Sequence, residues 1–337
     1  MPRPRSQKVA ELKAKLLTRI REGYFRPGDR FLSNRALAER FGVSYQTAHR
    51  LVGELCAEGW MERRPASGTY IAGEKTSLTG VQLLFHARAR REGSFGARLL
   101  ERLRLRLERE KIACSVSFVQ TSASLSNERF PVIWECEQAT LPCLAAGHYA
   151  LLLNSLPPSG ISGTFIDTVA TDDFSGGVCA AEILQARGHT RTAVLAGPQT
   201  DPRSVRRVEG FRSLLPDAKI AWADGWFFED GFKAAARLLP GENGTAVFCC
   251  NDRLAEGVLQ YCKKERLPAP ELVGFDDAPI AETLNLTTIS IPWDEMVESS
   301  LAIIRKRLRG DASTASRQIL APRPVIRRQY LNPSGRR

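Results

Sequence analysis

The sequence predicts an α/β protein in which an N-terminal winged helix-turn-helix precedes parallel sheets wrapped by helices. Residues 28–72 give, in order, a helix, a tight turn, a second helix and a hairpin. After Gly80, short apolar strands alternate with amphipathic helices, which is typical of parallel sheets covered by helices. The charge is also uneven, because residues 1–75 hold 15 of the 48 Lys+Arg but 8 of the 37 Asp+Glu, a net charge of +7 out of +11.

Helix caps and stops indicate the elements of the N-terminal module. A serine or asparagine caps the start of a helix, and a glycine tolerates the left-handed geometry at its end. The signals are, in order, an apolar face from Val9 to Ile20 stopped by Gly23, a cap at Ser33 or Asn34, a stop at Gly42, a second cap at Ser44, a stop at Gly59, and strands at Trp60–Arg63 and Thr69–Ala72.

The helix that begins after Ser44 separates a buried face from an outward one. Its apolar residues recur at i, i+3, i+4 and i+7, which predicts burial of Ala48, Leu51, Val52 and Leu55. The groups left outward can reach base edges in a major groove. They are Tyr45, Gln46, His49 and Arg50, with Thr47 at the edge. A small module for protein contacts is the alternative, but this outward chemistry favours DNA.

Residues 8–73 closely resemble the DNA-binding domain of the GntR family of bacterial regulators. The resemblance rests on the P-G-D-R turn, the run R-A-L-A-E-R-F-G-V-S, and the wing E-G-W…E-R-R-P…G-T-Y. It implies a phosphate contact at Arg35, base reading by the helix from Tyr45 to Arg50, and double-stranded DNA as the partner. The chain departs from the family at Tyr45 and His49, where arginine is common, so bidentate guanine contacts are lost there. The expected DNA-binding residues are Arg35, Ser44, Tyr45, Gln46, Thr47, His49, Arg50, Ser67 and Gly68.

Two readings remain open for individual residues of this helix. Gln46 can pair with adenine, and Thr47 can meet a phosphate or a thymine methyl group. Tyr45 can instead pack against the neighbouring helix. We therefore expect an operator sequence that differs from those of family members with two arginines.

The remainder of the chain shows strand and helix signals in alternation. Strands are expected at Val81–Phe85, Cys114–Gln120, Pro131–Trp134, Tyr149–Asn154, Thr164–Val169, Thr192–Ala196, Ala246–Cys249 and Glu271–Val273. Helices are expected near residues 95–107, 139–146, 177–187, 204–215, 231–239 and 252–264.

This region resembles the effector domain of the LacI family. The matching segments are 169–198, 205–212, 245–257, 272–277 and 286–289, whereas residues 86–92 depart from the usual pattern. The resemblance implies a periplasmic-binding-protein-like domain: two α/β lobes with a ligand between them, and crossovers near Gly188–Thr192, Ile291–Trp293 and Ala321–Pro324. A GntR-type reader with this sensor is the arrangement of the arabinose-repressor subgroup. The expected boundaries are 1–73 for the reader, 74–79 for a linker and 80–332 for the sensor, whose N-lobe is about 80–188 and 293–320 and whose C-lobe is about 191–290 and 322–332.

Four residues match ligand-holding positions of the LacI family: Arg207, Trp226, Asn251 and Asp276. Their chemistry suits a sugar, because Arg and Asn donate to hydroxyl oxygens, Asp accepts from hydroxyl protons, and an indole covers the apolar face of a ring. Each has a structural alternative. Arg207 can form a surface salt bridge, Asp276 can cap a strand end, and Trp226 can belong to the core with Trp222 as the ligand aromatic. Ile291 and Pro292 stand where relatives often have polar residues, which would favour a less hydroxylated ligand.

Other chemistries find little support. The eight cysteines contain no CxxC pair, and Cys249 and Cys250 would face opposite ways on a strand, so no metal or other cofactor is expected. Asp172 and Asp173 have no nucleophile beside them, and Asp172 suits a helix start better than catalysis. We expect no enzyme activity. No apolar run is long enough for a membrane helix or a signal peptide core, so we expect a cytoplasmic protein.

The sequence therefore predicts a homodimeric, ligand-responsive transcription regulator, with repression the expected action. It would bind an operator in duplex DNA and a small-molecule effector, expected to be a sugar or sugar derivative. Alternatives are a constitutive regulator whose sensor no longer binds ligand, a solute-binding protein, and a carbohydrate-active enzyme. The last would require carboxylates converging on the sugar from both lobes.

Overall fold

The protein, as a computed structural model, divides into two compact units. The described residues are 5–21, 24–25, 28–64, 67–72, 78–121, 123–144, 148–158, 165–239, 246–311 and 313–327. Unit 1 comprises residues 1–87, 104–168 and 300–317, and unit 2 comprises residues 88–103, 169–299 and 318–337. The expected linker at 74–79 lies largely outside the described residues, as does the end of the expected C-lobe beyond residue 327.

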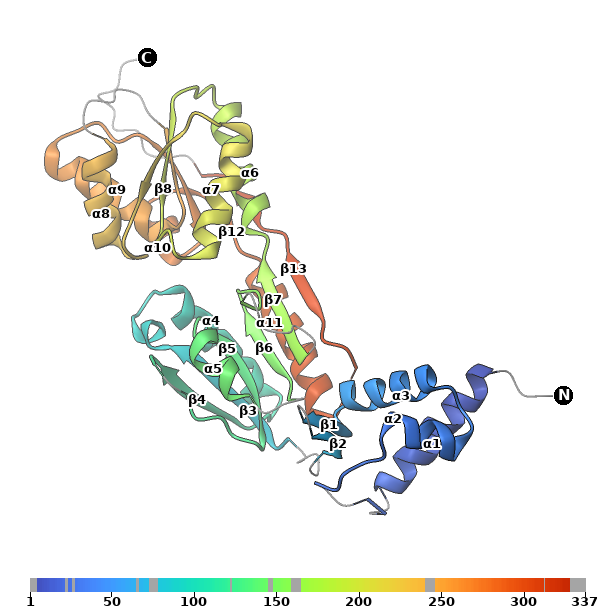
Figure 1. Ribbon diagram of the computed structural model, residues 1–337. Helices are drawn as coiled ribbons and strands as arrows, with labels where there is room; N and C mark the ends of the chain where they lie inside the picture. Colours follow the sequence, from blue (N-terminus) through green and yellow to red (C-terminus); the bar gives the residue numbers. More distant parts are fainter. Residues whose placement is uncertain are drawn as a thin grey trace. The chain divides into compact units, whose positions relative to one another are not determined.

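The N-terminal module is the predicted winged helix-turn-helix (Figure 1). Ser33 caps α2 by accepting a hydrogen bond from the backbone N–H of Ala36, and Ser44 caps α3 in the same way through Thr47. Gly42 ends α2 with φ of 61°, so the predicted stop is confirmed. The elements are α1 (Arg5–Arg21), α2 (Asn34–Phe41), α3 (Tyr45–Ala57), β1 (Met61–Arg64) and β2 (Gly68–Ile71).

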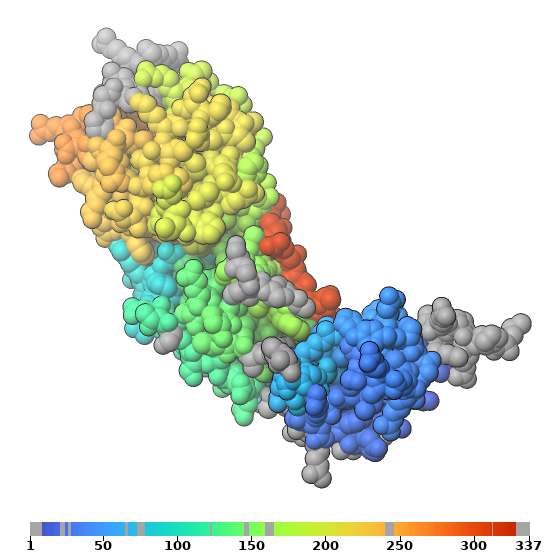
Figure 2. Space-filling view, in the orientation of Figure 1, coloured from blue at the N-terminus to red at the C-terminus, as the bar shows by residue number. Residues whose placement is uncertain are grey.

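The core of this module lies between its three helices and its hairpin. The predicted face of α3 is fully buried, together with Leu37 of α2 and Leu16 of α1. The space-filling view shows the module in blue as one continuous body (Figure 2). The hairpin pairs Met61 with Ile71 and Arg64 with Gly68, and the backbone of Phe31 donates to Thr69 beside it. The module is therefore a closed body that leaves the first turns of α3 exposed.

The first α/β sheet, sheet B, has six strands among the described residues, in the order β13-β7-β6-β5-β3-β4. Its neighbours β3–β4, β3–β5 and β5–β6 run parallel. Leu84, Ile133 and Leu152 form part of its buried core. The elements are β3 (Gly80–His86), η1 (Ala87–Arg90), α4 (Phe95–Arg109), β4 (Cys114–Val119), β5 (Arg129–Trp134), α5 (Glu137–Thr140), η2 (Leu141–Cys143), β6 (Ala150–Leu153), β7 (Ile166–Thr171) and β13 (Arg317–Leu320).

The second sheet, sheet C, lies in unit 2 with the described strand order β14-β12-β11-β10-β8-β9. It is parallel except for β14, which runs antiparallel to β12. The elements are α6 (Asp173–Ala186), β8 (Thr192–Ala196), α7 (Pro202–Leu214), β9 (Lys219–Trp222), α8 (Phe228–Leu238), β10 (Ala246–Cys249), α9 (Asp252–Glu265), β11 (Glu271–Asp276), α10 (Pro279–Thr283), β12 (Thr287–Ser290), α11 (Trp293–Leu308) and β14 (Arg323–Val325).

Helices cover both faces of sheet C (Figure 1). On one face, Phe211 of α7 stacks on Phe248 of β10 with ring centroids 5.2 Å apart. On the other, Ala234 of α8 and Leu254 of α9 join a buried cluster with Val247. This doubly covered parallel sheet brings the carboxyl ends of its strands to one edge, where ligands bind in such folds.

Glycines let the helices on each face approach closely. A Cβ on Gly177 of α6 would lie 2.1 Å from the carbonyl oxygen of Arg207, and one on Gly210 of α7 would lie 2.0 Å from that of Phe174. The other helix pair repeats the arrangement, since a Cβ on Gly257 of α9 would lie 2.3 Å from the carbonyl oxygen of Phe228. No other residue fits these contacts without moving a backbone.

Unit 2 includes residues 169–188, which were expected to belong to the N-lobe. Helix α6 packs on α7 and belongs to unit 2, so the chain leaves sheet B after β7 rather than near Gly188–Thr192. The glycine contacts between α6 and α7 explain this placement. Residues 88–103 also belong to unit 2, although the expected N-lobe included them. The later change of sheet between β13 and β14 lies between Leu320 and Arg323.

Candidate functional site

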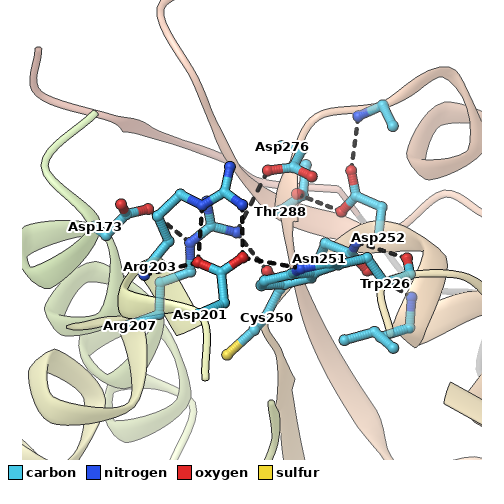
Figure 3. Close-up of polar contacts among 12 residues, drawn as sticks. Asp173, Asp201, Arg203, Arg207, Trp226, Cys250, Asn251, Asp252, Asp276 and Thr288 are labelled. Atoms are coloured by element: carbon cyan, nitrogen blue, oxygen red, sulfur yellow. Dashed lines mark hydrogen bonds and ion pairs between the residues drawn. The ribbon is translucent and has the colours of Figure 1, made fainter. Parts of the chain in front are cut away.

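The four predicted ligand residues lie together at the carboxyl edge of sheet C (Figure 3). Trp226 follows β9, Asn251 follows β10, and Asp276 is the last residue of β11. Arg207 reaches this edge from the middle of α7, and its guanidinium lies 5.7 Å from the centroid of the Trp226 ring. Strand ends and one helix therefore bring together residues that are far apart in the sequence.

Arg207 is buried, with 3% of its surface exposed, so it does not form a surface salt bridge. Its Nε donates to Asp173 Oδ1 at 2.7 Å, and its Nη1 donates to the carbonyl oxygen of Cys250 at 2.5 Å. The guanidinium also lies 3.6 Å from the centroid of the Phe275 ring, a cation–π contact. These contacts hold the charge at a fixed position in the site.

Asp276 combines an uncommon backbone conformation with a poorly compensated charge. Its φ is 96°, in the region that favours glycine, and the next residue, Asp277, has φ of 49°. Its Oδ1 is 3.5 Å from Nη1 of Arg207. Burial raises the pKa of Asp276 to about 6, although Arg207 opposes this shift. The carboxylate therefore keeps capacity to accept hydrogen bonds from a ligand.

The side chain of Asn251 was expected to donate to a ligand, but it makes two hydrogen bonds within the protein. Its Oδ1 accepts from the backbone N–H of Leu254 at 2.7 Å and so caps α9. Its Nδ2 donates to the carbonyl oxygen of Trp226 at 2.9 Å. Asn251 thus fixes the backbone that presents Trp226.

Trp226 lies over the backbone of Gly197, where a Cβ would come within 2.6 Å of the indole. Its Nε1 donates to Asp201 Oδ2 at 3.2 Å. The ring packs against the hydrophobic cluster of α8 and α9 on one side, so it belongs partly to the core. Trp222, the alternative aromatic, ends β9, and its carbonyl oxygen accepts from Arg237.

Three charged residues contact this group and were not among the predicted ligand residues: Asp173, Asp201 and Arg203. Asp173 binds Arg207, and burial raises the pKa of Asp173 despite that partner. Asp201 caps α7 and pairs with Arg203 through two side-chain bonds of 3.0 and 2.6 Å. Burial alone would raise the pKa of Asp201, but Arg203 holds it well below its ordinary value. The earlier interpretation of Asp172 is confirmed, since it caps α6 through Ser175.

A further polar residue, Asn154, lies at the corresponding edge of sheet B in unit 1. It follows β6 with φ of 54°, and 1% of its surface is exposed. Neither its amide nitrogen nor its amide oxygen has a hydrogen-bond partner among the described residues. A buried amide with no partner is costly, which makes Asn154 a second candidate ligand contact. The signal was present in the run A-L-L-L-N, where a polar residue directly follows a buried strand.

No group of three or more His, Cys, Asp or Glu side chains could hold a metal ion in the part of the chain that the structure describes. Over the same residues, each helix is too short or too polar to cross a bilayer.

The outward face of α3 has the chemistry expected of a base reader. Tyr45 is 55% exposed, so it does not pack into the neighbouring helix. Its ring stacks on that of His49 with centroids 6.3 Å apart and an interplanar angle of 28°. Gln46 is exposed beside them, and Arg35 is exposed in the first turn of α2. These positions leave the side chains available to a DNA groove.

The wing is held by contacts of its own residues. Arg64 donates from Nε to Glu62 at 2.7 Å, and its guanidinium lies 4.1 Å from the centroid of the Tyr70 ring. The Ser67 hydroxyl is 2.6 Å from that of Tyr70. Gly68 has φ of 122°, and a Cβ there would lie 3.2 Å from Nε of Arg30. Ser67 and Gly68, the predicted wing contacts, therefore lie against side chains of Tyr70 and Arg30.

Comparison with known families finds two separate domains in the chain. Residues 8–71 match the bacterial regulatory proteins of the gntR family, and residues 181–329 match the periplasmic binding protein-like domain. The chain joins a GntR-family domain to a periplasmic-binding-protein-like domain. The predicted resemblances are thereby confirmed on both sides of the linker.

Relatives of the second domain are named as repressors. The chain is 31% identical over 172 residues to the ribose operon repressor of Escherichia coli (strain K12), covering 48% of this chain and 52% of the repressor. It is 28% identical over 155 residues to the HTH-type transcriptional repressor PurR of Vibrio cholerae, covering 42% and 46%. The chain thus spans about half the length of these curated relatives.

Solved structures show the same fold. A LacI transcriptional regulator from a Rhodococcus species has a TM-score of 0.62 at 23% identity, covering 74% of this chain and 97% of that one. A LacI family regulator from Enterococcus faecium with bound ribose has a TM-score of 0.63 at 20% identity, covering 74% and 98%. The GntR-type reader of this chain is therefore fused to an α/β domain with the LacI-family fold.

Proposed function

We propose that the protein is a ligand-responsive transcription regulator that binds operator DNA through α3 and its wing, and a hydroxylated small molecule at the carboxyl edge of sheet C. The observation that carries this proposal is the combination, in one chain, of an exposed reading helix and a buried cluster with unsatisfied acceptor capacity at Asp276. The family matches and the repressor names of the relatives support it. Repression is the expected action.

The reader side rests on shape and charge. Residues 1–75 have a net charge of +7, as expected of a domain that meets phosphates. Arg35 would contact the backbone, and Gln46, His49 and Tyr45 would meet base edges. Because His49 and Tyr45 stack on one another, they would enter the groove as one unit.

The small-molecule side rests on the chemistry of three residues. Asp276 would accept from hydroxyl groups, Arg207 would donate to a hydroxyl or ring oxygen, and the Trp226 indole would cover an apolar ring face. Asn251 would act by holding Trp226. The ribose operon repressor and the ribose-bound neighbour make ribose the first molecule to test.

We also propose that the regulator acts as a homodimer in the cytoplasm and binds a near-palindromic operator with its two readers. The sensor domain would hold the dimer together, because a reader of ~65 residues offers little area for a stable interface. Sedimentation of a fragment beginning at Gly80 at micromolar concentration tests this. A monomer would contradict it.

The reader is tested by titration with operator and random duplex DNA at several salt concentrations. If each protomer of a dimer neutralises ~3–5 phosphates, the log–log salt slope is expected near −5 to −9. Arg35→Ala should weaken both DNAs alike, whereas Gln46→Ala and His49→Ala should mainly reduce the preference for operator. Arg212→Ala, which removes an exposed arginine of α7, is the control of equal charge. Equal losses on both DNAs for Gln46 and His49 would remove them from base reading.

A constitutive regulator is the second candidate. The departure of residues 86–92 from the LacI-family pattern favours it, as does Ile291 beside the predicted ligand site. Calorimetric titration with ribose and other sugars separates the two. Intact operator binding with no sugar bound by the wild type would favour the constitutive regulator.

A further inference from the structure

Residues 88–103, which we name the strap, belong to unit 2 although the chain on either side of them belongs to unit 1. The strap includes most of η1 and the first half of α4. It contains residues 88–92 of the 86–92 run that departs from the LacI-family pattern. Three of its contacts with the rest of unit 2 bear on the proposed ligand cluster.

The first contact is an ion pair near Trp226. Arg91 donates from Nη2 to both carboxylate oxygens of Glu229, at 2.7 and 2.9 Å. Its guanidinium also lies 3.6 Å from the centroid of the Phe227 ring. Arg91 is therefore held by two attractive contacts, with the residues one and three positions after Trp226. Trp226 is a proposed ligand residue.

The second contact requires a glycine. Gly93 has φ of 70°, and a Cβ there would lie 1.9 Å from Nη2 of Arg253 in α9. The guanidinium of Arg253 thus packs directly against the strap backbone. A side chain at Gly93 would oppose both this contact and the backbone conformation.

The third contact reaches the backbone of Asp276. Arg98 donates from Nη1 to the carbonyl oxygen of Asp277 at 2.6 Å, and its guanidinium lies 4.4 Å from the centroid of the Trp293 ring. Phe95 packs on the same indole with centroids 4.6 Å apart. Trp293 in turn donates from Nε1 to the carbonyl oxygen of Asp276 at 3.1 Å. The strap and the ligand residue therefore share one indole.

We propose that the strap is a built-in gate over the carboxyl edge of sheet C, seated by arginines of the chain itself before any small molecule binds. The strap contacts Phe227 and Glu229, which follow Trp226, and Asp277, which follows Asp276. A small molecule would reach Asp276 when the strap opens, and a shift at Asp276 would pass to Phe95 and Arg98 through Trp293. The small molecule in this inference rests on the proposed function, whereas the contacts of the strap are present in the structure without a ligand.

The strength of the contacts suits a gate. Arg91 and Glu229 are each nearly half exposed, at 45% and 46% of their side-chain surface, so their ion pair is screened by water. Local opening of such a segment costs less than global unfolding and is visible as hydrogen exchange. The strap is thus expected to open far more often than the sheet beneath it.

The test is hydrogen exchange measured by mass spectrometry on the full chain, without DNA or small molecule. Glu229→Gln removes the partner of Arg91 and leaves the strap sequence intact. Loss of one exposed pair should speed exchange of peptides within 88–103 by roughly 1.5- to 5-fold. Peptides covering 226–230 and 276–278 should follow, because an open strap uncovers them.

Glu209→Gln is the matched control. Glu209 is exposed to a similar degree and pairs with Arg206 at 3.0 Å within α7, away from the strap. Gly93→Ala is an independent variant, since it acts through Arg253 and the backbone rather than through charge. A rise in strap exchange in either strap variant, with the control unchanged, supports the gate. Unchanged exchange in both strap variants, or an equal rise in the control, would overturn it.

Operator binding is measured on the same proteins with duplex DNA. A wild type that fails to bind any DNA would contradict the proposed function and leave the exchange result valid. Conversely, wild-type operator binding with no change in strap exchange would contradict the gate alone.

Discussion

Asp276 lies 3.5 Å from the guanidinium of Arg207, although both side chains are nearly buried. The shorter bond of Arg207, at 2.7 Å, goes to Asp173. Arg207 therefore contacts two carboxylates, and its contact with Asp276 is the longer and weaker of the two. Burial raises the pKa of Asp276 to about 6, and Arg207 only partly opposes that shift.

Replacing this carboxylate should stabilise the fold at high pH. The folded-state pKa of Asp276 is raised from 3.8 to about 6. The resulting contribution of this residue to the free energy of unfolding is therefore present below pH ~4 and is lost as the pH rises through 6. Asp276→Asn removes that loss and should raise the free energy of unfolding at pH 8 by about 1–3 kcal/mol. Urea unfolding at pH 8 and pH 4 checks this. An equal effect at both pH values would contradict it.

The same residue should make binding depend on pH. If Asp276 accepts from a ligand hydroxyl, the ionised form binds better, so affinity should rise between pH 5 and pH 7.5. Asp276→Asn should reduce affinity at pH 7.5 by roughly 5- to 150-fold and flatten the profile. Titration with ribose, or with whichever sugar shifts operator affinity, measures both. A wild-type profile that is already flat would remove Asp276 from the site.

Trp226 should contribute by covering a ring face. Trp226→Ala is expected to weaken binding roughly 5- to 150-fold through lost contact area, with Trp222→Ala at the end of β9 as the matched control. Operator binding without ligand should survive both changes, because neither residue lies in the reader. A larger loss from Trp222→Ala would make Trp222 the ligand aromatic.

Two buried ion pairs allow stability and binding to be separated. Arg307 pairs with Asp167 in unit 1, each about 1% exposed, as Arg207 pairs with Asp173 in unit 2. Removing the arginine leaves a buried carboxylate unpaired, so Arg207→Gln and Arg307→Gln should each cost about 3–5 kcal/mol. Only Arg207→Gln should also weaken sugar binding below the unfolding temperature. Similar binding losses in both variants would indicate that Arg207 acts through stability alone.

Two Gly→Ala changes should have opposite effects on the stability of the fold. Gly177→Ala forces α6 from α7, because its Cβ would meet a carbonyl oxygen at 2.1 Å, and should cost about 1–3 kcal/mol or more. Gly53 lies inside α3 with its nearest neighbour, Nη2 of Arg63, at 4.0 Å. Gly53→Ala should therefore stabilise the reader by roughly 0.5–1 kcal/mol through helix propensity. Thermal unfolding of both variants decides the signs.

Local signals were enough to predict the helices and hairpin of the reader. Ser33, Gly42 and Ser44 determine helix ends within a few residues of chain, and their effects were confirmed. Arg207 and Asp276 were expected to act together from the LacI-family resemblance, and the structure brings their side chains within 3.5 Å of one another. The helix-end predictions succeeded because each depends on a short segment of chain.

What the sequence did not predict depends on contacts between distant segments. The placement of α6 follows from the fit between Gly177 and the backbone of Arg207, which no local pattern reveals. Asn251 was expected to face a ligand, but its amide binds the Trp226 carbonyl. The short strands β9, β12, β13 and β14 were not expected, since each has three or four residues and little periodicity.

The changes of sheet along the chain also affect the order in which the protein can fold during synthesis. Residues 5–71 contain every described element of the reader, whereas β13 and β14, the end strands of sheets B and C, come from residues 317–325. At ribosomal rates the intervening ~250 residues take roughly 10–50 s. The DNA-binding module can therefore form well before either sheet is complete, and a nascent chain would have a folded reader before it has a sensor.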